Sequence, residues 1–423
     1  MKKQRILKLT RLIFSILALV FLLTTSVWYP TQESDVIRRY TRPFEFDYIG
    51  WEIQAFWNKA LGLSFGIAHH LTIEQQREIV QDYFQLLAQS REIEGELTRL
   101  YSEPGKSNTD MVNQLENDLT LLDRRLEHQS MLAEPVIQHQ LSYAISSLGI
   151  TRVGTPFPAL LFQTTPLPKQ LIISPRDEIR QERSISLVSD ISLEEMIALE
   201  ELVEENTDYS ALVVPIGGVG TYPSMIIETT YLPNLLDTVA HEWIHNHLIF
   251  RPLGLRYLAT PALRTMNETT ANISGDEIMR ETLLIFYPEY FRQEFVPAAT
   301  LQANAAFFPL DNETGFSFSE TMYQTRVHVD ELLAQGKIKD AENFMDAQRQ
   351  IFWENGYQLR KLNQAYFSFY GAYADSPFSA AGSDPVGEDV RLFRSQQDSL
   401  ASFVWKMSWM FNYRQLRIAA RAF

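Results

Sequence analysis

The chain has 423 residues, with 52 acidic and 37 basic side chains and a formal net charge of −15. Five of the basic residues fall within the first 11 positions, so the rest has 32 basic against 52 acidic side chains, a balance that argues against nucleic-acid binding. The absence of cysteine excludes disulfides and thiolate metal sites. A chain of this length can bury one large or two modest cores.

The first 30 residues have the pattern of an export segment. Residues 1–11 contain five Lys or Arg and no acid, and residues 12–28 are uncharged and mostly apolar. This pattern predicts a signal-anchor, and therefore a single-pass cell-membrane protein whose remainder is extracytoplasmic. The alternative is a cleaved signal and a secreted protein, although residues 24–29 offer no clear small-x-small cleavage site.

Residues 31–150 are expected to be helical and to include an antiparallel coiled hairpin. Thr72 and Gln75 form a capping-box pattern before a long helix, and residues 102–109 supply the turn. We expect this hairpin to act as a spacer, a dimer contact or a cover. Its apolar positions are Ile79, Val80, Tyr83, Leu86, Leu87, Ile93, Leu97 and Leu100 in the first helix, and Met111, Leu115, Leu119, Leu122 and Leu126 in the second.

Residues 151–230 change to short apolar runs separated by proline and glycine, which predicts a small mixed sheet. Ser192 and Glu195 form a capping box for an intervening helix. The glycines of residues 217–220 are not followed by the Gly-Lys-Ser/Thr ending of a phosphate loop, so we expect a tight turn there. The expected strands are residues 159–163, 170–174, 184–188, 211–216 and 224–229.

An H-E-x-x-H pentad, His241-Glu242-Trp243-Ile244-His245, lies within an apolar-periodic run at residues 234–250. If the run is a helix, residues four apart share one face, so both imidazoles can bind one metal ion. Zinc held by two His and one carboxylate keeps a position for water, and Glu242 can take a proton from that water. The pentad therefore indicates metal-assisted amide hydrolysis. The alternative is a surface helix with two solvated histidines.

The third ligand is sought downstream, where residues 246–266 contain no Asp or Glu and Glu268 is the first carboxylate. Thr260 and Pro261 supply an N-cap and a first-turn proline for a second helix that runs to about Ser274. Two helices joined by residues 251–259 can pack antiparallel. Such packing would bring Glu268 back to the two histidines.

In residues 233–281 the chain resembles the gluzincin metallopeptidases, whose H-E-x-x-H is followed about twenty residues later by a Glu on the next helix. The resemblance implies that His241, His245 and Glu268 bind Zn²⁺ and that Glu242 is the general base. It places Asn272 at the position of the residue that orients a ligand histidine, although gluzincins often have Asp at that position. The metzincin pattern is excluded, because it needs Gly and His where this chain has Leu248 and Arg251.

The resemblance also implies a sheet edge beside the zinc helix that binds the substrate backbone as an added strand. Residues 222–229 are the candidate, with an ordinary inner strand as the alternative. Gluzincins further use a Tyr or His donor for the oxyanion. Tyr366, Tyr370 and Tyr373 share one predicted helical face, and Tyr370 is the preferred donor, with His328 as its rival. Core packing of the three tyrosines is the alternative.

Two C-terminal segments remain. Residues 375–389 are expected to form a loop, either a lid over the substrate or a plain solvent loop. Residues 390–422 are expected to form one helix with Trp405, Trp409 and a basic end. This helix is too short and polar to span a membrane. We expect it to pack on the domain, with contact to a membrane surface as a lesser alternative.

The sequence thus predicts an α+β fold that is mostly α: a signal-anchor at 1–30, a helical region at 31–150 and a metallopeptidase domain at 151–423. Within that domain we expect the sheet at 151–230, the zinc helices at 234–285 and further helices at 320–423. The expected function is a membrane-anchored or exported zinc metallopeptidase, an aminopeptidase included, acting on peptides or proteins. The alternatives are a non-catalytic helical envelope protein with a structural metal, and an interaction module built on the hairpin. Substrate, cleavage position and oligomeric state stay open.

Overall fold

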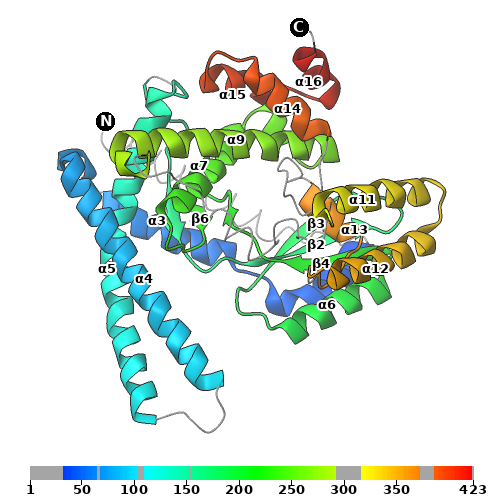
Figure 1. Cartoon of the computed structure of the whole chain (residues 1–423), viewed down its shortest axis with the longest axis horizontal. Helices are drawn as coiled ribbons and strands as arrows, with labels where there is room; N and C mark the ends of the chain where they lie inside the picture. Colours follow the sequence, from blue (N-terminus) through cyan, green and yellow to red (C-terminus); the bar gives the residue numbers. More distant parts are fainter. Residues whose placement is uncertain are drawn as a thin grey trace, which may run out of the picture. The chain divides into compact units, whose positions relative to one another are not determined.

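The computed structural model has an α+β fold that is mostly helical, as predicted (Figure 1). It describes residues 32–63, 67–102, 109–151, 154–291, 316–357, 359–371 and 385–421. The predicted signal-anchor lies outside these ranges. No helix within them is both long enough and apolar enough to cross a membrane. The chain divides into two compact units, Met1–Pro43 and Phe44–Phe423.

In the first unit the structure describes helix α2 (Gln32–Thr41), which is followed at the unit boundary by the 3-10 helix η1 (Arg42–Phe44). All other described elements belong to the second unit. Their first part consists of α3 (Tyr48–Leu63), the 3-10 helix η2 (Ile67–His70), α4 (Ile73–Ser102) and α5 (Thr109–Ser147).

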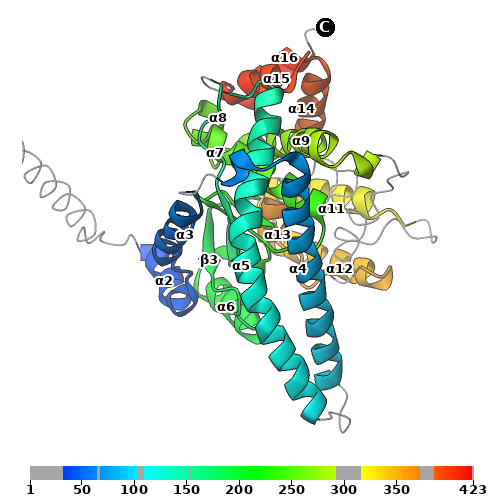
Figure 2. The same cartoon turned by 90° about the vertical axis from the view of Figure 1, so that its left-hand side faces the viewer.

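Helices α4 and α5 lie side by side as the predicted antiparallel hairpin (Figure 2). The capping box is present, because the Gln75 amide donates to Thr72 Oγ1 and the Thr72 amide donates to Gln75 Oε1. Leu97 and Leu100 pack with Val112, whereas the predicted core residue Met111 is 46 % exposed. The apolar stripe of α5 therefore starts one position later than the spacing suggested.

The strands form two three-stranded sheets instead of one. In the first, β2 (Lys169–Pro175) pairs antiparallel with both β3 (Arg183–Leu187) and β4 (Tyr209–Val214). In the second, β6 (Ser224–Ile226) is central, parallel to β1 (Phe162–Thr164) and antiparallel to β5 (Gly218–Val219). The division follows the two hydrophobic cores, because β2 and β4 pack into one core and β1 and β6 into the other.

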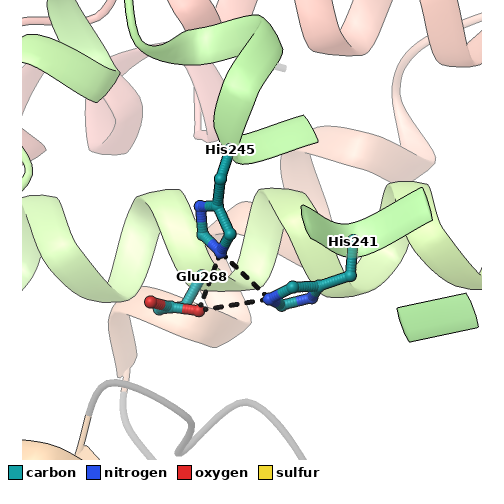
Figure 3. A group of neighbouring side chains, drawn as sticks. All are labelled: His241, His245 and Glu268. Carbon is teal, nitrogen blue, oxygen red and sulfur yellow. Dashed lines mark hydrogen bonds and ion pairs between the residues drawn. The ribbon is translucent and has the colours of Figure 1, made fainter. Parts of the chain in front are cut away.

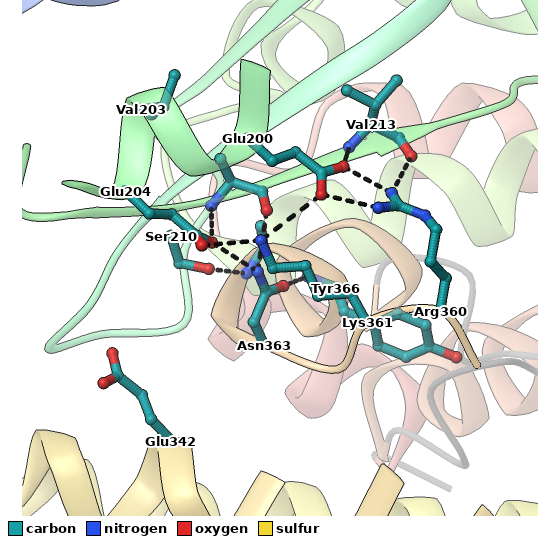
Figure 4. A network of polar contacts seen from close by, with 12 residues as sticks. Glu200, Val203, Glu204, Ser210, Val213, Glu342, Arg360, Lys361, Asn363 and Tyr366 are labelled. Atoms are coloured by element: carbon teal, nitrogen blue, oxygen red, sulfur yellow. Dashed lines mark hydrogen bonds and ion pairs between the residues drawn. The ribbon is translucent and has the colours of Figure 1, made fainter. Parts of the chain in front are cut away.

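The core around the first sheet is closed by α11 (Phe318–Ala334), α12 (Ile338–Glu354) and α13 (Gln364–Tyr370). A polar network then ties α6 (Leu193–Asn206) to β4 and to the segment before α13 (Figure 4). Glu200 on α6 is 1 % exposed and accepts from the Val213 amide at 2.6 Å and from both terminal nitrogens of Arg360 at 2.6 and 2.8 Å. The predicted capping box of α6, between Ser192 and Glu195, is also present.

The other core joins α5, the second sheet and the two helices of the H-E-x-x-H region to the C-terminal helices. The prediction of one helix at residues 390–422 is wrong: the chain forms α14 (Pro385–Ser395), α15 (Leu400–Ser408) and α16 (Tyr413–Ala420). Ser399 and Asn412 begin new helices, since their side chains accept hydrogen bonds from the Ser402 and Gln415 amides. Of the predicted loop at 375–389, the last residues belong to α14, and residues 375–384 lie outside the described ranges.

Candidate metal centre

Helices α7 (Leu232–Leu248) and α9 (Pro261–Phe286) carry the pentad and Glu268, with the short α8 (Pro252–Leu255) between them. The predicted N-cap is present, because Thr260 Oγ1 accepts from the Leu263 amide. The two helices are antiparallel: Asn267 contacts His245, whereas Gly275, further along α9, faces Asp237, earlier on α7. A Cβ at position 275 would lie 3.1 Å from the Asp237 carbonyl oxygen, so glycine permits this close approach.

Three side chains converge where the helices meet (Figure 3). Glu268 Oε2 lies 3.5 Å from His241 Nε2 and 3.4 Å from His245 Nε2, and the two Nε2 atoms are 3.0 Å apart. Tetrahedral ligands about 2.0–2.1 Å from one zinc ion are separated by about 3.3–3.4 Å. The spacing therefore fits a single metal ion among the three ligand atoms.

The two oxygens of Glu268 have different surroundings. The Tyr257 hydroxyl donates to Oε1. Oε2 is buried and has no hydrogen-bond partner. A buried carboxylate oxygen without a partner is costly, unless it binds a cation. The donor set and this unpartnered oxygen both fit a divalent metal.

Asn267 orients one histidine of the site. Its Oδ1 lies 2.8 Å from His245 Nδ1, and its Nδ2 donates to the Leu253 carbonyl, which fixes the amide orientation. His245 Nδ1 therefore donates, leaving Nε2 with a lone pair for a metal. The resemblance assigned such a role to Asn272, which is half-buried further along α9. Asn267 was overlooked because only the register between the helices shows which asparagine faces His245.

The tyrosine at the site is Tyr257, from the turn between α8 and α9. Its hydroxyl accepts from Arg264 Nε at 3.1 Å, and Arg264 in turn donates to the Ser368 carbonyl. Burial, followed by the charge of Glu268, raises the pKa of Tyr257, so its hydroxyl keeps its proton. Tyr257 could not be identified from the sequence, because it lies in a turn, where no helical periodicity marks it.

The preferred oxyanion donor, Tyr370, is not among the residues that line the cleft, although its neighbour Phe369 is. The Tyr370 ring lies 4.6 Å from that of Tyr366 and packs against Phe369, and burial raises the pKa of Tyr370 to about 12. Tyr373 lies outside the described residues. The rival donor His328 is half-exposed on α11, where it faces Glu331 at 3.5 Å.

An open cleft of about 480 Å³ leads to the cluster. Glu242, His245, Tyr257 and Glu268 are among its lining residues, as are polar side chains of the first sheet, such as Gln170. From the second sheet, β5 borders this cleft through Gly218 and Val219. Residues 222–229 were the candidate edge, but β6 within them is paired on both sides, which is the inner strand named as the alternative. In the second sheet, the edge strand at the cleft is β5.

Asn246 on α7 binds the turn between β5 and β6 and the first residue of β6. Asn246 Nδ2 donates to the Thr221 carbonyl at 3.0 Å and to Ser224 Oγ at 3.1 Å. A Cβ on Gly218 would lie 2.7 Å from Glu242 Cγ, so only glycine lets β5 pass this close to the carboxylate. The glycine run expected to be a plain turn therefore forms one wall beside Glu242.

The charges of the cluster favour a cation at its centre. Burial would lower the pKa of His241, but Glu268, Glu242 and Asp237 raise it to about 9. Burial would raise the pKa of Glu268, but His245 and His241 hold it well below its usual range. Burial raises the pKa of Glu242. Buried carboxylates thus surround the two imidazoles, and a bound metal would supply the positive charge that they favour.

The site combines three convergent ligand atoms, a carboxylate beside them and an open cleft, which together are suited to metal-assisted hydrolysis. Comparison of the chain with protein-family models, with curated proteins and with solved structures finds no match.

Proposed function

We propose that this protein is a zinc metallopeptidase of gluzincin type that hydrolyses peptide bonds in the cleft. One observation carries the proposal: Glu268 Oε2 is buried without a hydrogen-bond partner between two imidazole Nε2 atoms, next to Glu242. A purely structural metal would have no use for the open cleft or for a carboxylate directly after the first ligand.

In this proposal His241, His245 and Glu268 hold the metal, which when bound polarises the scissile carbonyl and lowers the pKa of water. Glu242 accepts the proton of the attacking water and passes it to the leaving nitrogen. Asn267 and Tyr257 keep two of the ligands oriented.

The free edge of β5 is the proposed site for the substrate backbone. Its partner β6 occupies only one side of β5, and Gly218 and Val219 border the cleft. An extended peptide could add there as a further strand, beside Glu242. The predicted export segment would place this activity outside the cytoplasm.

Elemental analysis of the purified protein, beside Glu268→Ala and Glu242→Gln variants, tests the proposal. We expect one zinc per chain in the parent, loss of zinc with Glu268→Ala, and retained zinc with peptide hydrolysis reduced about 10²–10⁴-fold with Glu242→Gln. A parent protein without zinc, purified without chelator, would contradict the metal assignment. Zinc with a peptide-library signal unaffected by Glu242→Gln would support the structural-metal alternative.

A further inference from the structure

A second pocket lies between the residues at the end of α7 and α15. It has a volume of about 710 Å³ and is lined by Phe157, Phe250, Arg251, Trp405 and Trp409, among others. Helix α8 contacts α15, and its last residue, Leu255, lies one helical turn after the pocket residue Arg251, whose carbonyl accepts from the Leu255 amide at 2.9 Å. We call Phe157, Phe250, Leu255, Trp405 and Trp409 together the tryptophan face.

All five side chains of the tryptophan face are exposed to solvent. Phe250 and Leu255 are each 72 % exposed, Trp405 is 59 % exposed and Trp409 is 49 % exposed. The two indole rings stack edge to face, with centroids 5.7 Å apart. Single exposed apolar residues are common, but such a group of large ones around a pocket marks an interaction surface.

The segments that carry this face contain no acidic residue. Residues 148–176, 246–267 and 399–423 contain no Asp or Glu, in a chain with 52 acidic residues. The exposed basic side chains on the last two segments include Arg256, Lys406, Arg414 and Arg417. Among the described residues no carboxylate pairs with any of these four, and Lys406 instead donates to Gln397 Oε1 at 2.7 Å.

We propose that the tryptophan face docks onto the surface of a bilayer containing anionic lipids. Indole rings prefer the headgroup level, where one part of the ring contacts hydrocarbon and the N–H contacts water. Arg256 and Lys406, which directly follow Leu255 and Trp405, can extend towards lipid phosphates. The net charge of −15 repels the protein from an anionic surface, so docking favours a part of the surface with few acids, and the segments that carry the tryptophan face contain none.

This docking has a consequence for the cleft. Ile249 lines the cleft, and the next residue, Phe250, lines the pocket of the tryptophan face. The end of α7 thus joins the two surfaces. A docked protein therefore holds this side of the cleft close to the bilayer.

The test uses the full chain, which has no cysteine and accepts a single labelling site. Leu255→Cys places an environment-sensitive fluorophore on the tryptophan face, and Leu121→Cys places it on α5, where Leu121 is 56 % exposed. Because both variants retain the N-terminal segment, any anchoring by that segment is common to both. Each is mixed with vesicles of phosphatidylcholine, or of equal parts phosphatidylcholine and phosphatidylglycerol.

We expect a blue shift, and quenching by spin-labelled lipid, for the probe at 255 with the anionic vesicles only. The double change Arg256→Glu and Lys406→Glu, in the Leu255→Cys background, should abolish that shift. No shift at 255 while the chain floats with the vesicles would overturn the proposal, as would equal shifts at 255 and 121. A shift that grows with protein concentration in the absence of vesicles would overturn it in favour of a second copy of the chain.

Discussion

Gly218 passes so close to Glu242 that a Cβ at position 218 would lie 2.7 Å from Glu242 Cγ. The edge strand and the proposed general base are therefore fitted to each other. Gly218→Ala should displace the carboxylate and lower kcat by about 10²-fold, because proton transfer depends on position at the ångström scale. Zinc content should not change.

Gly217→Ala is the matched control, since a Cβ at position 217 has no atom within 4 Å. Peptide hydrolysis and zinc content are measured for both variants. Equal activities of the two would show that Glu242 tolerates the displacement.

Because Asn267 is hydrogen-bonded to His245 Nδ1, we expect it to affect zinc affinity more than Asn272, the other candidate asparagine of α9. Asn267→Ala should weaken zinc binding about 10–100-fold, because the imidazole loses the partner that fixes its orientation. Asn272→Ala, at the position suggested by the resemblance, should have a smaller effect. Competition with a chromogenic chelator measures both affinities, and a larger loss at position 272 would reverse the assignment.

The roles of Tyr257 and Tyr370 can be distinguished by replacing each with Phe. Tyr257→Phe removes the hydroxyl that donates to Glu268 Oε1 and accepts from Arg264, so zinc affinity should fall about tenfold or more. Tyr370→Phe should leave zinc affinity unchanged, because its ring packs on Tyr366 and Phe369. If Tyr370→Phe lowers kcat at an unchanged zinc content, the original oxyanion assignment regains support.

We expect the buried carboxylate of Glu200 to stabilise the fold independently of the metal. Glu200→Ala leaves the Arg360 guanidinium and the Val213 amide without their shared acceptor. We expect the free energy of unfolding to fall by about 1–3 kcal/mol, because the Val213 amide is left buried without an acceptor while Arg360 stays partly solvated. Denaturant unfolding of this variant is compared with Glu201→Ala, an exposed position on the same helix, which should change stability by less than about 0.5 kcal/mol.

His247 predicts a pH dependence of stability. Burial, and then the charge of Arg251, lowers its pKa to about 4, and its Nδ1 donates to the Phe157 carbonyl. In the unfolded chain the imidazole takes up a proton near pH 6.5. The stabilisation of the folded state by neutral His247 is therefore fully present above that pH. As the pH falls from about 6.5 to about 4, the free energy of unfolding decreases by an amount on the order of 3 kcal/mol.

Thermal unfolding between these pH values should therefore be less steeply pH-dependent in His247→Asn than in the parent protein. His128→Asn, at an exposed position on α5, is the control and should reproduce the parent curve. A parent-like slope in His247→Asn would mean that other groups cause the acid sensitivity.

Much of the fold was predictable from local signals. The capping residues Thr72, Ser192 and Thr260 were each identified from residues three or fewer positions away, and each begins a helix. Ser399 and Asn412 are capping residues of the same kind, and their signals were available but overlooked in the prediction of one C-terminal helix. Such signals are readable because the hydrogen bonds close within one helical turn.

By itself, the sequence determined the pair of imidazoles four residues apart on one helix and the nearest following carboxylate, since both follow from helical geometry and chain order. Only the tertiary structure decided that Asn267 faces His245, that Tyr257 holds Glu268 and that β5 is the free edge. These contacts depend on the register between α7 and α9 and on the order of the strands. Packing across the whole core sets that register and that order, and no short segment of the sequence specifies them.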